Sequence, residues 1–349
     1  GGHDGASLAP LGWRAGIQPF PDPEPGPGEV LVRVEACGVG LTVLNYIQGQ
    51  LGQRPEDLPR IPGHEAVGVV VRAGPGAEGL FSPGQRVMAY FYLTCGACDF
   101  CRLAHEPLCR RFRGYVGVAT HGGYAQYMVL PAANWLAVPE GVAPEQATAI
   151  PDAIATPFHV SRRAAIGPGD RVLVVGAGGG VGIHMVQMAS LFGGRVVGVD
   201  LGEAKLRAVE QAGAAGAVDF GDGGDEAVQH VRRAAGGAPT VAVDFVGSPQ
   251  TLEFCLRCLD RRGRLVAVTT FPGVAVPVEP RRLVFDELTV LGSRYASRWE
   301  VAQAAQLVAD GRIRPVVSQV EPLSRAPVLF QRLRARQLIG RGAVVPEQG

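Results

Sequence analysis

Two hydrophobic patterns divide the chain at about residue 165. Before this point, short alternating or apolar segments are separated by turns rich in glycine and proline, such as the turn at 21–28. Short strands at this spacing are typical of a barrel-like β domain. The strands predicted in this part are Val30–Val34, Ala66–Val71 and Gln85–Tyr90.

After residue 165, apolar runs with β-branched residues alternate with helical stretches of about 10–15 residues. This alternation predicts parallel βαβ units and a doubly wound sheet. The predicted strands are Arg171–Val175, Arg195–Val199, Ala217–Phe220, Thr240–Phe245 and Arg264–Val268. The predicted helices between them are Ile183–Phe192, Glu203–Gln211, Glu226–Ala235 and Gln250–Leu259.

The pattern changes again from about residue 295. It predicts helices at Trp299–Asp310 and Arg325–Arg336, and extended segments at Val316–Val320 and Gly342–Val345. The last segment could return to the first part of the chain. We expect the arginine-rich stretch 332–341 to form a solvated helix face. Arg341 could reach the functional site in the first part of the chain, but the sequence offers no partner for it.

Composition limits the classes of partner. The 349 residues carry a net charge of +1, with 47% hydrophobic and 19% charged residues. This balance indicates a globular protein with no electrostatic signature for nucleic acid or for an anionic membrane. No apolar run is long enough to span a bilayer, and no secretory signal is visible. Seven cysteines, an odd number, fit a reducing cytoplasm better than a disulfide framework, so we expect a cytoplasmic protein.

Four of those cysteines lie close together, at Cys95, Cys98, Cys101 and Cys109. This spacing allows four thiolates to converge on one tetrahedral ion, and Zn²⁺ accepts four sulfurs without a geometric penalty. Disulfides are the alternative, but clustering of this kind favours a metal. Because four thiolates leave no open coordination position, we expect a structural zinc ion that stabilises a lobe spanning residues 93–112.

A glycine-rich turn, GAGGGVG at 176–182, follows one predicted strand and opens a helix. Such a turn lets backbone N–H groups approach a pyrophosphate at the helix N-terminus. Asp200 ends the next strand, where a carboxylate accepts hydrogen bonds from ribose hydroxyls and repels a 2′-phosphate, so NAD(H) is favoured over NADP(H). A flavin site, or a helix-capping role for Asp200, is the alternative. The predicted cofactor contacts are Gly176, Ala177, Gly179, Gly180, Val181, Gly182, Asp200, Lys205 and Val246.

Together these elements resemble the medium-chain dehydrogenase/reductase superfamily, specifically its zinc-type alcohol dehydrogenase branch. The matching segments are Cys37–Val39, Pro62–Glu65, the four-cysteine lobe, Gly122–Tyr127, the glycine turn with Asp200, and Gly292–Ser293. The resemblance implies an α/β protein with a GroES-like β-rich catalytic domain (1–155 and 295–349) and a Rossmann NAD-binding domain (156–294) with a doubly wound parallel sheet. It also implies hydride transfer at a nicotinamide in the cleft between the domains, commonly in a homodimer or homotetramer.

The family's catalytic zinc site is only partly retained. Gly40 stands where the family has its first ligand, a cysteine, and Val43 stands where it has an acidic residue. The second ligand, His64, and the neighbouring Glu65 are present, and Asp152 stands at the third ligand position. A catalytic zinc usually needs three protein ligands and one open position. The resemblance therefore implies a degenerate catalytic zinc site.

Two arrangements of this site remain open. In one, His64 and Asp152 bind zinc with help from Glu65 or Cys37. In the other, no catalytic zinc is present, and His64 and Asp152 form a hydrogen-bonded pair that acts as a general acid. Thr42 matches the hydroxyl that begins the family's proton relay. Asn45 falls at the relay's histidine position, where it can pass a hydrogen bond but does not titrate.

Three functions are compatible with these residues. The first is an NAD-dependent alcohol dehydrogenase or carbonyl reductase acting on a small molecule, which the four-cysteine lobe and Asp200 favour. The second is a zinc-independent reductase of activated C=C bonds, such as enones or enoyl thioesters, which the substitutions at Gly40 and Asp152 favour. The third is a catalytically silent nucleotide-binding protein, which intact Thr42 and His64 argue against weakly.

Overall fold

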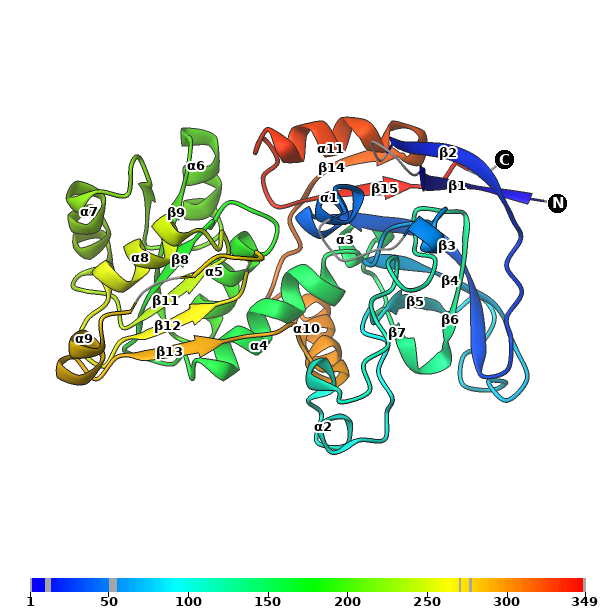
Figure 1. The fold of residues 1–349 in the computed structure, drawn as a ribbon, viewed down its shortest axis with the longest axis horizontal. Helices are drawn as coiled ribbons and strands as arrows, with labels where there is room; N and C mark the ends of the chain where they lie inside the picture. The colour runs from blue at the N-terminus through cyan, green and yellow to red at the C-terminus, as the bar shows by residue number, and fades with distance from the viewer. Residues whose placement is uncertain (1, 10–13, 50–54, 270, 276–277, 348–349) are drawn as a thin grey trace. The chain divides into compact units, whose positions relative to one another are not determined.

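The computed structural model describes residues 2–9, 14–49, 55–269, 271–275 and 278–347, and the chain divides into two compact units (Figure 1). The first unit comprises residues 1–152, 296–310 and 317–349. The second comprises residues 153–295 and 311–316. Each unit has its own sheet, and the groups predicted to carry chemistry divide between them.

The first unit is built on a mixed sheet. Over the described residues its strands follow the order β14-β15-β3-β4-β5-β7, and β6 also pairs with β3. Strand β15 is parallel to β14 and antiparallel to β3, so this late strand lies inside a sheet made mostly from the first 140 residues. The predicted return of Gly342–Val345 to the first part of the chain is therefore confirmed. The strands are β3 (Glu29–Val39), β4 (Ala66–Ala73), β5 (Arg86–Ala89), β6 (Tyr127–Pro131), β7 (Trp135–Ala137), β14 (Val317–Pro322) and β15 (Arg341–Val345).

Short helical segments connect these strands, and a separate hairpin precedes them. The hairpin consists of β1 (Gly2–Ala9) and β2 (Arg14–Pro21). The α-helices are α1 (Leu41–Ile47), α2 (Asp99–Arg102), α3 (Pro144–Ala147), α10 (Arg298–Ala309) and α11 (Ala326–Arg334). Single 3₁₀ turns lie at Pro55–Asp57, Glu106–Leu108, Ala132–Asn134 and Leu323–Arg325, and a π-turn at Ile150–Ile154 follows α3.

The second unit contains a parallel sheet, with strand order β10-β9-β8-β11-β12-β13 over the residues that the structure describes. Its strands are β8 (Arg171–Val175), β9 (Arg195–Asp200), β10 (Gly216–Asp219), β11 (Val241–Asp244), β12 (Arg264–Ala267) and β13 (Thr289–Gly292). Its helices are α4 (Ala155–Arg163), α5 (Gly182–Leu191), α6 (Glu203–Gln211), α7 (Asp225–Ala235), α8 (Pro249–Cys258) and α9 (Pro280–Phe285). In the described ranges of the whole chain, no helix has the length and apolarity needed to cross a membrane.

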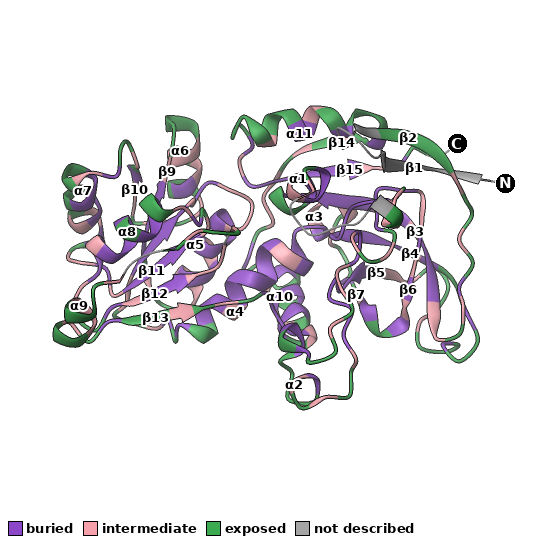
Figure 2. Cartoon of the chain, in the orientation of Figure 1, coloured by how far each residue is buried: buried purple, intermediate pink, exposed green. Residues whose placement is uncertain are grey.

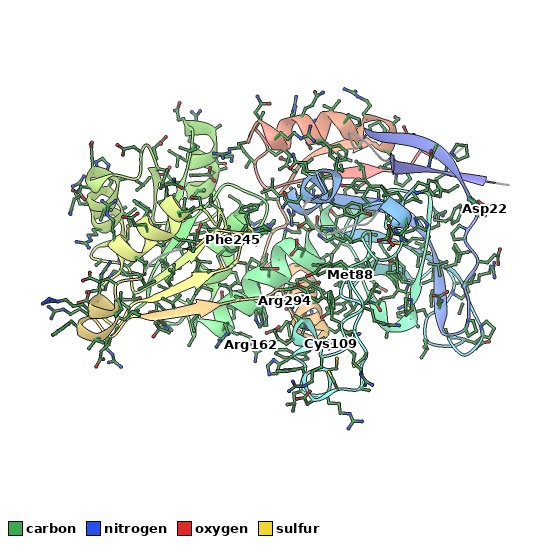
Figure 3. All side chains as sticks on the ribbon, viewed as in Figure 1. Asp22, Met88, Cys109, Arg162, Phe245 and Arg294 are labelled. Atoms are coloured by element: carbon green, nitrogen blue, oxygen red, sulfur yellow. The ribbon has the colours of Figure 1, made fainter. Side chains whose placement is uncertain are left out.

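Alternation along β8 explains why both faces of this sheet are covered. Val172 and Val174 pack with buried residues of α4, α5 and α6, whereas Leu173 and Val175 pack with α7 and α8. A strand buried on both faces is apolar at nearly every position, and the run Arg171–Val175 that predicted β8 has this pattern. Figure 2 shows the buried strands at the centre of this sheet, and Figure 3 labels Phe245, which follows β11, and Met88, which is fully buried in β5 of the first unit.

The predicted elements are present, and most boundaries are within two residues of the prediction. Helices α1 and α4 were not predicted. Helix α1 follows Gly40, which provides no side-chain cap, and α4 has Pro157 in its first turn. Their starts therefore lack the serine, threonine or aspartate signal that marks a helix in a sequence.

Candidate functional site

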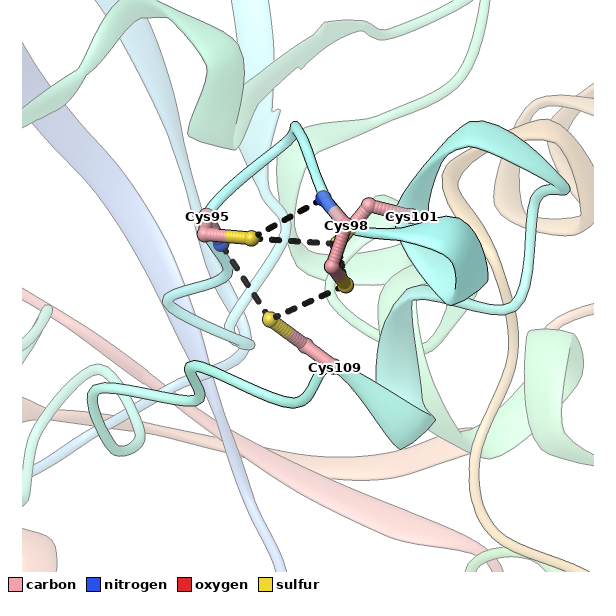
Figure 4. A group of neighbouring side chains, drawn as sticks. All are labelled: Cys95, Cys98, Cys101 and Cys109. Carbon is pink, nitrogen blue, oxygen red and sulfur yellow. Dashed lines mark hydrogen bonds between the residues drawn. The ribbon is translucent and has the colours of Figure 1, made fainter.

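The four cysteines of the lobe converge as predicted (Figure 4). Cys98 Sγ lies 3.5 Å from Cys101 Sγ and 4.0 Å from Cys109 Sγ, and Cys95 Sγ lies 4.0 Å from Cys101 Sγ. Four sulfurs at about 2.3 Å from a tetrahedral zinc ion are separated by about 3.8 Å. The spacing thus fits zinc, and the predicted four-cysteine structural zinc site is confirmed.

Backbone groups prepare these sulfurs to act as thiolates. The Cys98 N–H donates to Cys95 Sγ and the Cys95 N–H donates to Cys109 Sγ, both at 3.3 Å. A hydrogen bond from the backbone of Ala97, followed by others from its neighbours, lowers the pKa of Cys95 to about 5. Backbone hydrogen bonds also lower the pKa of Cys98, whereas burial raises the pKa of Cys101 to about 12. The thiolate, the form that binds metal, is therefore favoured at Cys95 and Cys98 in particular.

Arg298, the first residue of α10, connects the four-cysteine lobe to the rest of the first unit through side-chain contacts. Its Nη2 donates to Thr94 Oγ1 at 3.0 Å, directly before the first cysteine. Its Nη1 lies 3.4 Å from a carboxylate oxygen of the buried Glu106, and the guanidinium lies 4.9 Å from the centre of the Tyr90 ring. The lobe is thus a supporting element whose ligands leave no position for a substrate.

The glycine-rich turn of the second unit has the shape expected for a dinucleotide site. Gly176 has a φ of +78°, which favours glycine, and a Cβ at Gly182 would overlap the Gly176 carbonyl group. Helix α5 begins at Gly182, so the turn leads into a helix N-terminus. Val246 is adjacent, with its Cγ2 3.2 Å from the place of a Cβ at Gly176.

Asp200 ends β9 beside this turn and is held in place by three donors. Its Oδ2 accepts from Gly178 N at 2.8 Å, and its Oδ1 accepts from Leu201 N at 2.8 Å and from Lys205 Nζ at 3.2 Å. Lys205 is the chain's one lysine among 33 lysine and arginine residues. The Lys205 stem also packs tightly, because its Cβ lies 2.8 Å from the place of a Cβ at Gly178.

The candidate catalytic residues of the first unit lie around a buried arginine that the sequence did not assign. Arg341 begins β15 and is only 7% exposed, so the prediction that 332–341 forms a solvated helix face is wrong for Arg341. Helix α11 ends at Arg334, and the chain then returns into the sheet. Nη2 of Arg341 lies 2.7 Å from Asp152 Oδ2 and 2.8 Å from Glu65 Oε1. The first contact is a directed hydrogen bond, and the second is an ion pair without that alignment.

Gly40 and Gly38 leave the space that this cluster occupies. A Cβ at Gly40 would lie 2.9 Å from Cζ of Arg341 and closer still to Nη1. A Cβ at Gly38 would lie 2.9 Å from Cβ of Glu65 and closer still to its carboxylate. Gly40 has an extended backbone, with φ −129° and ψ 172°, which any residue can adopt. A side chain at Gly40 would therefore be disfavoured by its collision with Arg341 and not by the backbone conformation.

His64 is the member of the cluster that faces a pocket. Its Nε2 is buried and has no hydrogen-bond partner among the described residues, and it lies 3.7 Å from Asp152 Oδ2. That distance is too long for the predicted His64–Asp152 hydrogen bond, because Asp152 is held by Arg341 instead. Thr42 and His64 line the same small pocket, which also includes Tyr46, Gly117 and neighbouring residues. Asn45 lies on α1 with Thr42 but is not among the residues lining this pocket.

Burial affects the charges of this cluster. It raises the pKa of the fully buried Glu65 above its usual value, an effect that Arg341 opposes. It also tends to lower the pKa of Arg341, but Glu65 and Asp152 outweigh this and raise that pKa.

His64, Glu65 and Asp152 place ligand atoms within 4.8 Å of one another, whereas Cys37 is not part of this group. Cys37 is buried beside Gly63 and Gly123, where burial raises the pKa of its thiol.

The chain matches two protein families over separate ranges. Residues 26–140 match the alcohol dehydrogenase GroES-like domain, and residues 180–310 match the zinc-binding dehydrogenase family. An alcohol dehydrogenase from Geobacillus stearothermophilus is 34% identical over 90% of this chain and 91% of its own. An acryloyl-coenzyme A reductase from Metallosphaera sedula is 30% identical over 93% of this chain and 94% of its own.

Solved structures agree with these matches. A thermostable alcohol dehydrogenase from Pyrobaculum aerophilum superimposes with a TM-score of 0.89 and 31% identity, over 99% of this chain and 100% of its own. The predicted fold class, a GroES-like domain with a Rossmann-type parallel sheet, is thus confirmed. The chain belongs to the zinc-type alcohol dehydrogenase family of medium-chain dehydrogenases and is an alcohol dehydrogenase-like, NAD(P)-dependent oxidoreductase.

Proposed function

We propose that the chain uses NADH to reduce a C=C bond conjugated to a carbonyl group, as in an enone or an enoyl thioester. The observation that carries this proposal is Gly40, which offers no metal ligand where the family has a cysteine. Of the remaining candidate ligands, His64, Glu65 and Asp152, the two carboxylates are paired with the Arg341 guanidinium. As they stand, these residues fit a catalytic zinc ion poorly, and the proposed site is a degenerate one without that ion.

Reduction of a conjugated C=C bond needs less polarisation than reduction of an isolated carbonyl. Hydride adds to the β-carbon, the C=C electron pair moves toward the carbonyl, and an enolate forms that is protonated at the α-carbon. A hydrogen-bond donor at the developing oxyanion stabilises this enolate. His64, which lines the same small pocket as Thr42, is the candidate donor for that role. Thr42 would orient the substrate, and Asn45 would extend the hydrogen bonding from Thr42 along α1.

Relatives with a named C=C substrate support this reading. Besides the Metallosphaera sedula protein, an acryloyl-coenzyme A reductase from Sulfurisphaera tokodaii is 28% identical over 95% of this chain and 96% of its own. Acryloyl-coenzyme A is an enoyl thioester, which is the bond arrangement proposed here. Both relatives match nearly the entire chain.

The proposal is tested by NADH oxidation with two matched substrate sets, one of enones and enoyl thioesters and one of saturated aldehydes and ketones. We expect kcat/KM for the first set to exceed that for the second by at least about 100-fold, equivalent to about 2.7 kcal/mol of transition-state stabilisation. His64→Ala should lower kcat more than it raises KM. Turnover of saturated carbonyls without enone turnover would contradict the proposal.

A second candidate is alcohol and carbonyl interconversion, which two observations favour. Thr42 and His64 line one pocket, as a hydroxyl relay would require, and the 34% identical relative is an alcohol dehydrogenase. In that case the aldehyde set would be the faster one. No turnover of either set with NADH or NADPH would instead favour a nucleotide-binding protein without catalysis.

We propose NAD(H) as the cofactor, bound at Gly176, Ala177, Gly179, Gly180, Val181 and Gly182, with Asp200 on the adenosine ribose and Val246 beside the turn. The position of Lys205, the chain's one lysine, also supports a cofactor contact at Asp200. Lys205 Nζ donates to Asp200 Oδ1 at 3.2 Å, which would place its ammonium group beside the ribose hydroxyls that Asp200 binds.

Lys205→Met is therefore expected to raise KM for NADH by about 10–100-fold, because it removes one hydrogen bond to a charged group. The fold should be little affected, since Lys205 lies in the first turn of α6 and methionine keeps the apolar stem that packs beside Gly178. Arg207→Met is the matched control, because Arg207 lies on the same helix and pairs with Glu203 in solvent. Equal effects of the two substitutions on KM would argue against a cofactor contact at Lys205.

We further propose a homodimer or homotetramer located in the cytoplasm and acting on a small-molecule substrate. The composition supports the location, and the family supports the assembly. Light scattering of the purified full chain would measure its mass, and a mass of one chain at micromolar concentration would contradict the oligomer.

A further inference from the structure

A fully buried histidine contacts the glycine-rich turn of the second unit. His184 lies in the first turn of α5, and its Nδ1 is 2.7 Å from the carbonyl oxygen of Gly180, within the glycine-rich turn. Its Nε2 is 2.9 Å from the backbone nitrogen of Val316. All three residues belong to the second unit, so one ring joins the turn to the chain segment 311–316.

These two partners determine where the ring carries its proton. A neutral imidazole has one N–H donor and one acceptor nitrogen. The Gly180 carbonyl can only accept a hydrogen bond, so Nδ1 must donate to it. The Val316 N–H can only donate, so Nε2 must accept. The two contacts together fit only the neutral ring with its proton on Nδ1, because an imidazolium would place two donors face to face at Val316.

The segment that contacts Nε2 is itself fixed to α5. Gln187, one helical turn after His184, donates from Nε2 to the Arg314 carbonyl at 2.9 Å and accepts from the Arg314 N–H at 2.8 Å. Val316 lies two residues further along the same segment, so the backbone that presents its N–H is anchored at Arg314. The proton position on His184 is thus set by a backbone group 132 positions away in the sequence.

We propose that His184 is a positioning residue of the cofactor site, which sets the orientation of the peptide between Gly180 and Val181. Because a peptide group is planar and trans, its C=O and N–H point in opposite directions. A carbonyl directed at the buried ring therefore directs the Val181 N–H away from the ring, to the side where the start of α5 would receive a pyrophosphate. This inference rests on the proposed cofactor site for the place of the pyrophosphate.

The glycine-rich turn needs such a contact because its own sequence gives it little rigidity. Positions 178–180 are three successive glycines, the residue with the largest backbone freedom. Without a bond to the Gly180 carbonyl, this peptide could rotate and move the Val181 N–H out of line. Cofactor binding would then have to restrain the peptide, at a cost in conformational entropy. The bond from His184 Nδ1 restrains it before the cofactor arrives, which favours binding.

Two substitutions of His184 separate its two contacts. In His184→Asn, the side-chain amide can replace the Nδ1–H donor to Gly180 but is too short for Val316. In His184→Gln, the longer side chain can accept from Val316 with its carbonyl oxygen but removes the donor to Gly180. We expect the Kd for NADH, measured by fluorescence titration of the full-length protein, to rise about 10-fold in His184→Gln and to stay within about threefold in His184→Asn.

Thermal unfolding of the same variants separates positioning from a general loss of packing. Each variant loses one buried hydrogen bond, so the two should lose similar stability. His230→Gln is the matched control, because His230 is exposed on α7 of the same unit, 3.9 Å from Glu226, and its loss should leave the Kd unchanged. Equal rises in Kd for the two His184 variants would overturn the inference.

The protonation state of the wild-type ring gives a test that needs no variant to fold. In ¹⁵N NMR spectra with assigned histidine rings, His184 at neutral pH should be a neutral ring protonated on Nδ1. An imidazolium, or a ring protonated on Nε2, would overturn the inference whatever the variants do. If neither variant folds, this measurement decides. Tighter binding of NADPH than of NADH by a protein with the expected ring would contradict the NAD(H) proposal alone.

Discussion

Replacing Cys98 by serine is expected to release the structural zinc ion and to lower Tm by about 10 °C. Zinc bound to small cysteine-rich peptides contributes an apparent 10–16 kcal/mol at neutral pH. Even a quarter of that free energy corresponds to several degrees, because 1 kcal/mol shifts Tm by about 2–4 °C in a domain of this size. Differential scanning calorimetry and zinc stoichiometry would be measured on the same preparation.

Arg110→Ala is the matched control for this experiment. Arg110 follows the last cysteine, and its guanidinium pairs with Asp99 at 2.8 Å on the exposed surface of the same lobe. Exposed pairs of this kind contribute about 0–1 kcal/mol, so Arg110→Ala should retain zinc and a nearly native Tm. A Cys98→Ser variant that keeps full zinc occupancy and stability would disprove the structural role of the lobe.

Asp200→Ser is expected to change cofactor preference more than any other single substitution in the second unit. The substitution removes a carboxylate that would bind the ribose hydroxyls of NADH. A hydrogen bond to a charged group contributes about 1.5–3 kcal/mol, so its loss should raise KM for NADH by about 10–100-fold. It also removes the charge that would repel a 2′-phosphate, and it releases Lys205 Nζ, now 3.2 Å from Asp200, to attract that phosphate. The ratio of kcat/KM for NADPH over NADH should rise by about 1,000-fold in steady-state measurements.

Asp219→Ser provides the comparison, because Asp219 ends β10 directly beside Asp200 in the register of the sheet. It too accepts hydrogen bonds from backbone N–H groups, those of Gly202 and Gly221. Removing its charge should leave the cofactor ratio within about threefold of the wild-type value, since it lies one strand farther from the glycine turn. A similar shift in both variants would indicate a general electrostatic effect and not ribose recognition by Asp200.

Much of the fold could be predicted because its signals are local. The strand at Arg171–Val175 is apolar at nearly every position because both of its faces are buried, and the helices around it repeat with the spacing that buries one side. The cysteine spacing and the glycine turn are likewise short motifs that carry their own geometry. The short helix α1 could not be predicted in this way, because Gly40 provides no cap to mark its start.

The candidate catalytic site depends on a contact that no local pattern reveals. Asp152 and Arg341 are 189 positions apart, and they meet only because β15 pairs with β3 inside the first sheet. From the sequence, Arg341 could reach this site, but no partner for it could be identified. The missing ligand at Gly40 was visible in the sequence, whereas the closeness of Arg341 to Gly40 was not. The structure brings His64, Glu65 and Asp152 together, but Asp152 bonds Arg341 where a bond to His64 was predicted.

The position of β15 also has a consequence for the order in which the protein is made. At about 5–20 residues per second, about 10–40 s pass on the ribosome between the synthesis of Asp152 and that of Arg341. During that interval β3 presents an unpaired edge where β15 will later bind, and Glu65 and Asp152 lack their cation. The second unit, by contrast, is complete in sequence by residue 316. The nascent first unit therefore passes through a period with an open sheet edge, when a chaperone would protect it best.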